Sequence, residues 1–207
     1  MSWLLNRFML PLVLLFCRGL QENGAQACTC LLLHPQQVFC QVDVVIKAKV
    51  VSTTADGGLN PIKYDIQQIK NFKGPEKVFA AVYTASSSAA CGITLTNGVE
   101  YLLMARLQSD GSLYITSCDF HQPWDDMSAT QKSLLQLYGM GCDCKITRCS
   151  SLPCGISSWT ECLWTDFLPV KMANAEQARN FACVKRREGS CAWYRGSASP
   201  AKEFRGR

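Results

Sequence analysis

The sequence predicts a mainly β fold with added helices, in which a five-stranded barrel of the OB type precedes a small disulfide-rich domain. Segments of strand character, separated by turn residues, fill most of the chain between residues 42 and 118. The 13 cysteines among 207 residues are typical of a secreted, disulfide-bonded protein. Beyond residue 27 these cysteines divide evenly about residue 142, which indicates two separately bridged domains.

The barrel is predicted from five segments rich in β-branched and aromatic residues. They are residues 42–51, 64–72, 78–84, 99–107 and 113–118. Turn signals separate them, such as Ala55-Asp56-Gly57-Gly58 and Ser109-Asp110-Gly111. Residues 128–138 predict a helix, because Ser128 and Gln131 have capping-box spacing. A five-stranded barrel with an added helix is the general pattern of an OB-fold.

Residues 1–27 have the features of a secretory signal peptide. Arg7 supplies the positive charge, residues 8–16 form the apolar region, and Ala25-Gln26-Ala27 is a cleavage signal. The apolar region is too short to cross a bilayer, and no later stretch is long enough. We therefore expect a secreted, extracellular protein with no membrane span, whose mature chain begins at Cys28.

The remaining twelve cysteines predict two domains, residues 28–142 and residues 143–207. Each contains six cysteines, and the pairing stays open because twelve cysteines allow about ten thousand combinations. Residues 143–207 also carry the positive charge, with 11 basic and 6 acidic side chains. In this second domain, Asn174 and Gln177 have capping-box spacing, which predicts a helix over residues 174–183.

Several function classes are excluded by what the sequence lacks. A net charge of +5 is too small to favour a nucleic-acid binder. No catalytic or phosphate-binding motif is present, and the even cysteine count leaves no free thiol nucleophile. The cysteine spacings lack the Cys-x2-Cys knuckle of structural zinc sites, and His34 and His121 are too few for a metal triad. We expect no enzyme, no cofactor, and structural roles for both histidines.

Two features have open interpretations. Cys28 and Cys30 would fix the mature N-terminus by two disulfides, although chain termini are usually mobile. Either the geometry of this terminus matters for function, or the bridges merely fasten the first strand. Lys185-Arg186-Arg187, together with Arg205 and Arg207, could bind sulfated polysaccharide or could be a solvated turn and tail.

From Cys28 onward the chain resembles the tissue inhibitors of metalloproteinases. The matching segments are Cys28-Thr29-Cys30, His34-Pro35-Gln36-Gln37, Val44 to Lys49, Phe72 to Lys77, Cys91-Gly92, Cys118-Asp119-Phe120, Cys142-Asp143-Cys144-Lys145, Glu161 to Trp164 and Cys191 to Gly196. The resemblance implies a netrin-like OB-fold barrel for residues 28–142. It also implies the disulfides Cys28–Cys91, Cys30–Cys118, Cys40–Cys142, Cys144–Cys191, Cys149–Cys154 and Cys162–Cys183.

The resemblance further implies that the α-amine and carbonyl oxygen of Cys28 bind the catalytic zinc of a matrix metalloproteinase. Thr29 would enter the adjacent pocket of the protease catalytic domain, and Cys30, Leu31 and Leu32 would follow the cleft like substrate. A second contact strip would consist of Ser88, Ala89, Ala90 and Cys91. We expect a monomer whose partners through the C-terminal domain are a progelatinase hemopexin domain or sulfated glycans.

Leu31-Leu32-Leu33 departs from the more polar, usually proline-containing stretch of the family. This departure keeps a second function open, that of a non-inhibitory extracellular matrix or receptor-binding netrin-like module. Such a module tolerates a blocked or extended N-terminus, whereas an inhibitor that binds zinc through its α-amine does not.

Overall fold

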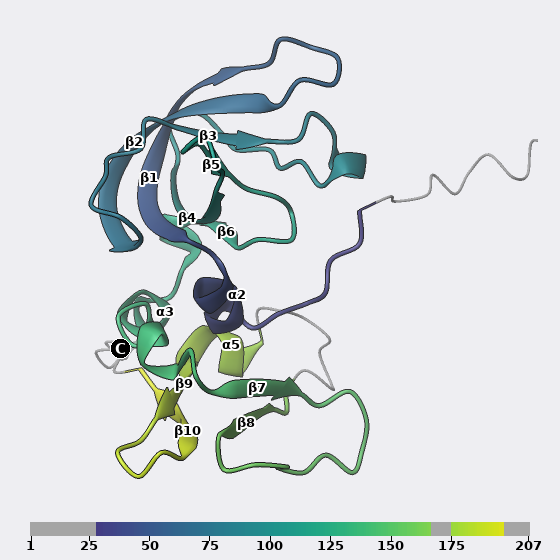
Figure 1. Cartoon of the computed structure of the whole chain (residues 1–207), viewed down its shortest axis with the longest axis vertical. Coiled ribbons are helices and arrows are strands. Elements are labelled where there is room, and N and C mark those ends of the chain that lie inside the picture. The colour runs from purple at the N-terminus through teal and green to yellow at the C-terminus, as the bar shows by residue number, and fades with distance from the viewer. Residues whose placement is uncertain (1–27, 167–174, 197–207) are drawn as a thin grey trace, which may run out of the picture.

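The computed structural model describes residues 28–166 and 175–196 (Figure 1). The predicted signal peptide, Asn174, Arg205 and Arg207 lie outside these residues. The first part contains α2 (Pro35–Gln41), β1 (Val44–Thr54), β2 (Ile62–Lys73), β3 (Ala81–Thr84), η1 (Ser88–Ala90), β4 (Glu100–Leu107), β5 (Leu113–Tyr114), β6 (His121–Pro123), η2 (Trp124–Asp126), α3 (Ala129–Leu134) and η3 (Tyr138–Gly141). The second contains β7 (Lys145–Arg148), β8 (Glu161–Trp164), α5 (Glu176–Asn180), β9 (Phe181–Lys185) and β10 (Cys191–Arg195).

The predicted five-stranded barrel is confirmed. The strands pair in the order β1-β2-β3-β5-β4, and β4 also pairs with β1, which closes the barrel. All these pairs are antiparallel except β3 with β5. The short strand β6 adds to the free side of β4 and was not expected from the sequence.

The first half of β1 is buried on both faces, which explains why its apolar run alternates only in part. Val44, Ile46 and Val50 lie in the barrel core. Val45 points to the opposite face, because successive side chains of a strand alternate, and joins a second core with residues of α2 and α3. The barrel is therefore covered on one side by helices, as Figure 1 shows below β1 and β4.

Two predicted strands are shorter than expected. The segment 78–84 becomes a strand only at Ala81. The segment 113–118 pairs only at Leu113–Tyr114, because the carboxylate of Asp119 accepts hydrogen bonds from the amide and hydroxyl of Thr116 and folds residues 116–119 into a turn.

The predicted helix over residues 128–138 is only partly formed. Ser128 caps α3 as expected, accepting a hydrogen bond from the amide of Gln131 at 3.0 Å. The α-helix ends at Leu134, and the chain reaches Cys142 through the 3₁₀ turn η3.

The second part of the chain has two small sheets, parallel β7–β8 and antiparallel β9–β10. The predicted helix over residues 174–183 is wrong beyond Asn180, because Phe181–Lys185 pairs with β10 and Cys183 forms a disulfide with Cys162. Ala175, rather than Asn174, occupies the cap position of the five-residue α5. Within residues 28–166 and 175–196, no helix has the length and apolarity needed to cross a membrane.

The two parts meet at α2, a helix that the sequence interpretation missed. Pro35 occupies its first turn, where the missing amide proton is harmless. The side chain of Gln36 donates to the carbonyls of Cys183 (2.7 Å) and Tyr138 (3.1 Å) and accepts from the amide of Cys183 (2.7 Å). The predicted domain boundary falls between η3 and β7, and α2 joins the segments on both sides of it.

Candidate functional site: a disulfide-tethered N-terminal ridge

Six disulfides join the described cysteines, and they are the six pairs that the family resemblance implies. They are Cys28–Cys91, Cys30–Cys118, Cys40–Cys142, Cys144–Cys191, Cys149–Cys154 and Cys162–Cys183. The first two bring four sulfur atoms within 4.8 Å of one another. Because every one of these sulfurs is already in a disulfide, the cluster offers no thiolate for a metal ion. Its role is to attach residues 28–30 to two loops of the barrel.

The first of these loops is residues 87–92, and its backbone is closely constrained. The carbonyl of Ser87 accepts hydrogen bonds from the amides of Ala90 (3.1 Å) and Gly92 (2.8 Å). Cys91 has a φ of 63°, a left-handed conformation uncommon for a residue with a side chain. Only glycine fits at position 92, since a Cβ there would lie 2.2 Å from the carbonyl oxygen of Ala85. The loop therefore presents Ser88, Ala89 and Ala90 to solvent on a fixed turn.

The second loop is residues 116–119, whose organising residues the sequence interpretation missed. The buried carboxylate of Asp119 accepts from the amide (3.0 Å) and hydroxyl (2.8 Å) of Thr116 and from Arg106 (3.3 Å). The amide of Ser117 donates to the carbonyl of Cys91 at 2.9 Å, which fastens the two loops together. A threonine followed three positions later by an aspartate, as in Thr116 and Asp119, is a turn signal that could have indicated this loop.

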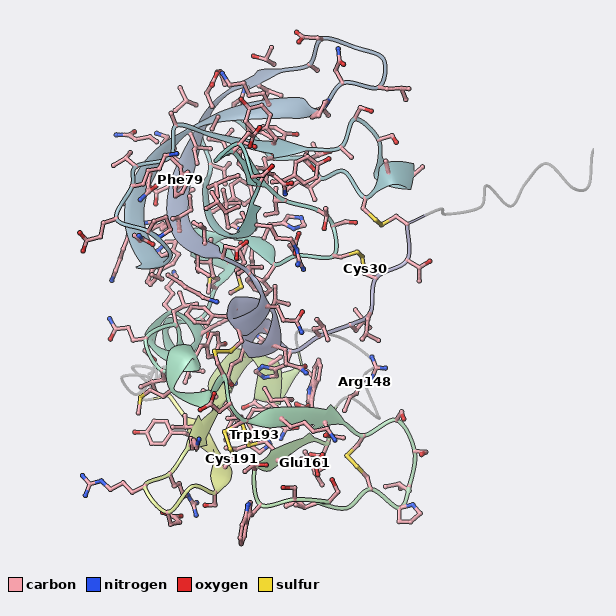
Figure 2. All side chains as sticks on the ribbon, viewed as in Figure 1. Cys30, Phe79, Arg148, Glu161, Cys191 and Trp193 are labelled. Carbon is pink, nitrogen blue, oxygen red and sulfur yellow. A yellow bond between two sulfur atoms is a disulfide. The ribbon has the colours of Figure 1, made fainter. Side chains whose placement is uncertain are left out.

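Residues 28–33 run as an extended, exposed segment from these loops to α2 (Figures 1 and 2). Cys28 and Cys30 are half-buried, whereas Thr29 between them is exposed. Leu31 and Leu32 are 67% and 41% exposed, which is unusual for adjacent large apolar side chains. The predicted contact residues of the two strips are thus brought together by disulfide Cys28–Cys91. We call this surface, residues 28–32 and 88–91, the N-terminal ridge.

The inner end of the ridge is fixed by His34, which is fully buried. Its Nδ1 accepts from the amide of Gln36 (3.2 Å), while Gln37 accepts from the amide of His34 (3.0 Å), so that the two residues cap α2 reciprocally. Its ring packs against Trp164 and Trp193, with centroid distances of 5.4 and 5.2 Å. Burial lowers the pKa of the His34 imidazole from 6.5 to about 4. His34 is therefore neutral at physiological pH and structural, as predicted.

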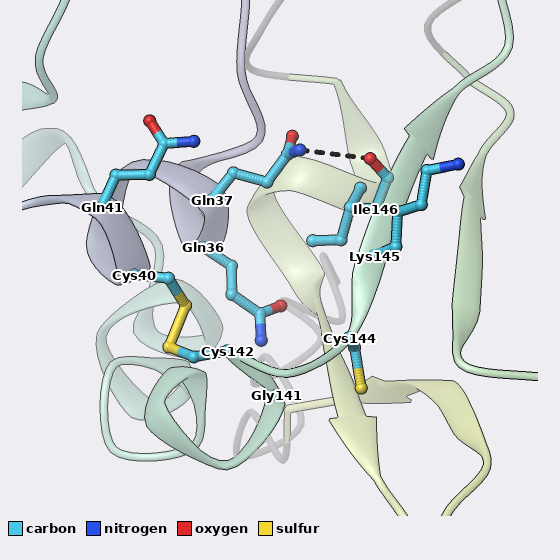
Figure 3. Close-up of a pocket in the computed structure, with 9 residues that line it drawn as sticks. All are labelled: Gln36, Gln37, Cys40, Gln41, Gly141, Cys142, Cys144, Lys145 and Ile146. Atoms are coloured by element: carbon cyan, nitrogen blue, oxygen red, sulfur yellow. Dashed lines mark hydrogen bonds between the residues drawn. A yellow bond between two sulfur atoms is a disulfide. The ribbon is translucent and has the colours of Figure 1, made fainter.

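A crevice of about 280 Å³ separates α2 from β7 (Figure 3). Gln36 lines it, but both ends of its amide are already hydrogen-bonded. Gln37 bridges the crevice by donating to the carbonyl of Ile146 at 3.1 Å. Since these polar side chains already have partners, the crevice marks the seam between the two parts of the chain rather than a ligand site.

The predicted basic cluster lies on the β9–β10 hairpin, and acidic side chains accompany it. Lys185 contacts Asp143 at 3.1 Å, and Arg186 approaches Glu188 at 3.9 Å. Arg187 is exposed on the same turn. The local positive charge is therefore smaller than the sequence suggests.

The fold and the ridge together define a class of protein. OB-type barrels commonly bind other macromolecules, and the extended, disulfide-fixed N-terminal ridge is the candidate surface for such binding here. The family model of the tissue inhibitor of metalloproteinase matches residues 26–193, so the chain belongs to this family. It is accordingly a metalloproteinase inhibitor and not an enzyme.

Relatives extend over nearly the whole chain. It is 54% identical over 209 residues to metalloproteinase inhibitor 2 of Cavia porcellus, which covers 96% of this chain and 94% of the relative. It is 55% identical over 191 residues to metalloproteinase inhibitor 2 of Homo sapiens, covering 87% of each chain. The corresponding Gallus gallus protein is 51% identical over 195 residues, covering 89% of each.

Proposed function

We propose that the protein is secreted, is cleaved after Ala27, and inhibits zinc matrix metalloproteinases tightly, reversibly and 1:1. The new α-amine and the carbonyl oxygen of Cys28 bind the catalytic zinc of the protease. Thr29 enters the pocket beside the zinc, and residues 30–32 and 88–91 contact the cleft walls.

The chemistry of a free N-terminal residue supports this proposal. A catalytic zinc keeps one coordination position for water, which an amine and a carbonyl oxygen can displace. The amine must be neutral to donate its lone pair, and an α-amine has an ordinary pKa of about 7.7–8.0. Deprotonation at pH 7 therefore costs only about 1 kcal/mol. An internal residue could not act in this way, because its nitrogen is an amide.

The observation that carries the proposal is the attachment of both Cys28 and Cys30 to the barrel with Thr29 exposed between them. A segment fixed in its bound shape loses little conformational entropy on binding. The protease cannot cleave at this point, because mature Cys28 has no peptide bond before it.

Two readings on one secreted sample test the proposal. Mass spectrometry of the N-terminal peptide should find Cys28 as the first residue, and titration against an active matrix metalloproteinase should reach complete inhibition at a 1:1 ratio. A Cys28 terminus without inhibition of several such proteases would contradict the inhibitory function.

The pocket role of Thr29 has its own test. Thr29→Gly should weaken inhibition by roughly 1–3 kcal/mol, because the apolar contact in the pocket is lost. Thr94→Gly is a matched control, since Thr94 is exposed on a loop outside the ridge. An inhibition constant unchanged by Thr29→Gly would refute the pocket role.

The alternative function, a matrix module that binds sulfated glycans, is supported by the exposed Arg187 beside Arg186. It predicts that retention on immobilised heparin falls when both arginines become alanine. It also predicts that an N-terminal extension leaves this retention unchanged. Under the inhibitory function, by contrast, the same extension should abolish protease inhibition.

A further inference from the structure

The N-terminal ridge is touched by a side chain from the other part of the protein. Arg148, the last residue of β7, donates from Nη1 to the carbonyl oxygen of Leu32 at 3.2 Å. The two residues are 116 positions apart in the sequence. No sequence motif pointed to this contact.

This hydrogen bond falls where the ridge has least support. Cys28 and Cys30 are held by disulfides, and Leu33 packs against the core beneath α2. Between these anchors, Leu31 and Leu32 are exposed. Among the described residues, the bond from Arg148 is the only hydrogen bond that reaches the backbone of residues 28–33.

Arg148 itself stands on a firmly held strand. It pairs with Trp164 of β8, and the next amide, that of Cys149, donates to the carbonyl of Trp164 at 3.1 Å. The hydroxyl of Thr147 donates to the buried carboxylate of Glu161, which also accepts from the amide of Ser157 at 2.7 Å. These donors lower the pKa of Glu161 to about 2, so the network stays charged and intact at neutral pH.

We propose that Arg148 is a positioning residue of the N-terminal ridge, through which the C-terminal part of the chain sets the path of residues 31–33. This inference rests on the proposed inhibitory function. A charged donor on the Leu32 carbonyl favours one backbone path for the exposed leucines. Losing it lowers the fraction of molecules ready to bind, and apparent affinity falls by the same fraction.

Arg148→Met in the full chain removes the donor and keeps the apolar stem. We expect roughly a three- to tenfold rise in the inhibition constant. Arg148→Lys, which keeps a charged donor, should restore part of the loss. Arg186→Ala is the charge-matched control and should change nothing, because Arg186 lies on the β9–β10 hairpin.

Backbone NMR order parameters of the free protein supply the second readout. The order parameters of residues 31–33 should be lower in Arg148→Met than in the wild type, with Arg148→Lys between them. If Arg148→Met does not fold, the Lys variant decides, since a positioning role requires it to shift both readouts in the same direction. If the wild type inhibits, a change in inhibition without a change in the order parameters, or the reverse, would overturn the proposal, as would no change in either.

The proposed inhibitory function and the positioning role of Arg148 would be contradicted by different results. If the wild-type protein inhibits no metalloproteinase, the proposed function fails. The comparison of order parameters then still decides whether Arg148 positions the ridge. If the wild type inhibits and both readouts ignore Arg148, only the positioning role fails.

Discussion

His34 should contribute to the destabilisation of this protein by acid. Its imidazole is buried against Trp164 and Trp193, its Nε2 lies 3.3 Å from the carbonyl of Gln177, and its Nδ1 accepts from the amide of Gln36. Protonation would put a charge in this apolar site and would turn the Nδ1 acceptor into a donor facing another donor. The folded protein therefore resists protonation, which is why burial lowers the pKa of His34 from 6.5 to about 4.

The sign and size of the effect follow from this pKa. The unfolded chain binds a proton at His34 below pH 6.5, whereas the folded protein binds it only near pH 4. The stabilisation is complete above pH 6.5 and is lost as the pH falls towards 4. At about 1.4 kcal/mol for each pH unit, the whole interval corresponds to about 3 kcal/mol, of which about 2 kcal/mol is lost by pH 5.

Guanidinium unfolding of the disulfide-intact protein at pH 7.5 and pH 5.0 measures this loss. His34→Asn is the matched variant, because asparagine can cap α2 but does not titrate. The fall in unfolding free energy between the two pH values should be about 2 kcal/mol larger for the wild type than for His34→Asn. Equal falls in the two proteins would refute the account of His34.

Two further substitutions test the seam around α2. Gly141→Ala should destabilise the fold by about 3 kcal/mol or more, because the new Cβ would lie 1.7 Å from the carbonyl oxygen of Cys183. Thermal unfolding measures this loss. Gly155→Ala is the control and should be nearly neutral, because the space around Gly155 is open. Lys73→Met should cost about 2 kcal/mol, because the ammonium donates to three carbonyls at the end of α2 (2.8, 3.1 and 2.6 Å). Lys49→Met is the control and should be nearly neutral, because the Lys49 side chain on β1 is exposed. Equal melting temperatures of the two variants would contradict this role of Lys73.

The barrel could be predicted because its strands repeat a local pattern. Apolar residues of β1 alternate towards the barrel core, and turns with positive-φ glycines such as Gly57 and Gly111 separate neighbouring strands. The ends of the strands could not be predicted in the same way. The turn at residues 116–119 depends on the carboxylate of Asp119, which also bonds Arg106 of β4.

The second part of the chain was predicted poorly for a physical reason. Residues 181–185 form a strand because β10 and the Cys162–Cys183 disulfide hold them, and such tertiary contacts override local helix signals. Helix α2 was missed although the signals were present. His34 and Gln37 form a capping box and Pro35 occupies the first turn, but histidine stands at the cap position where serine or threonine is the usual signal.

The N-terminal ridge likewise contains residues that the sequence predicted and residues that only the structure shows. Cys28, Thr29 and Cys30 could be predicted as contact residues because they resemble a family segment, and the disulfide Cys28–Cys91 brings residues 88–91 beside them. Ser117 and Arg148 were missed, since their contacts with the ridge join residues far apart in the sequence. Only the folded chain shows that both loops and the C-terminal part contribute to one surface.

The central claim is that the free α-amine of Cys28 binds the zinc of the target protease. The most direct measurement titrates one active matrix metalloproteinase with the mature protein and with a variant that carries one extra alanine before Cys28. Both samples should have the same melting temperature, since the disulfides are unchanged. The account predicts stoichiometric inhibition by the first and none by the second. Equal inhibition by the two would contradict zinc binding through Cys28.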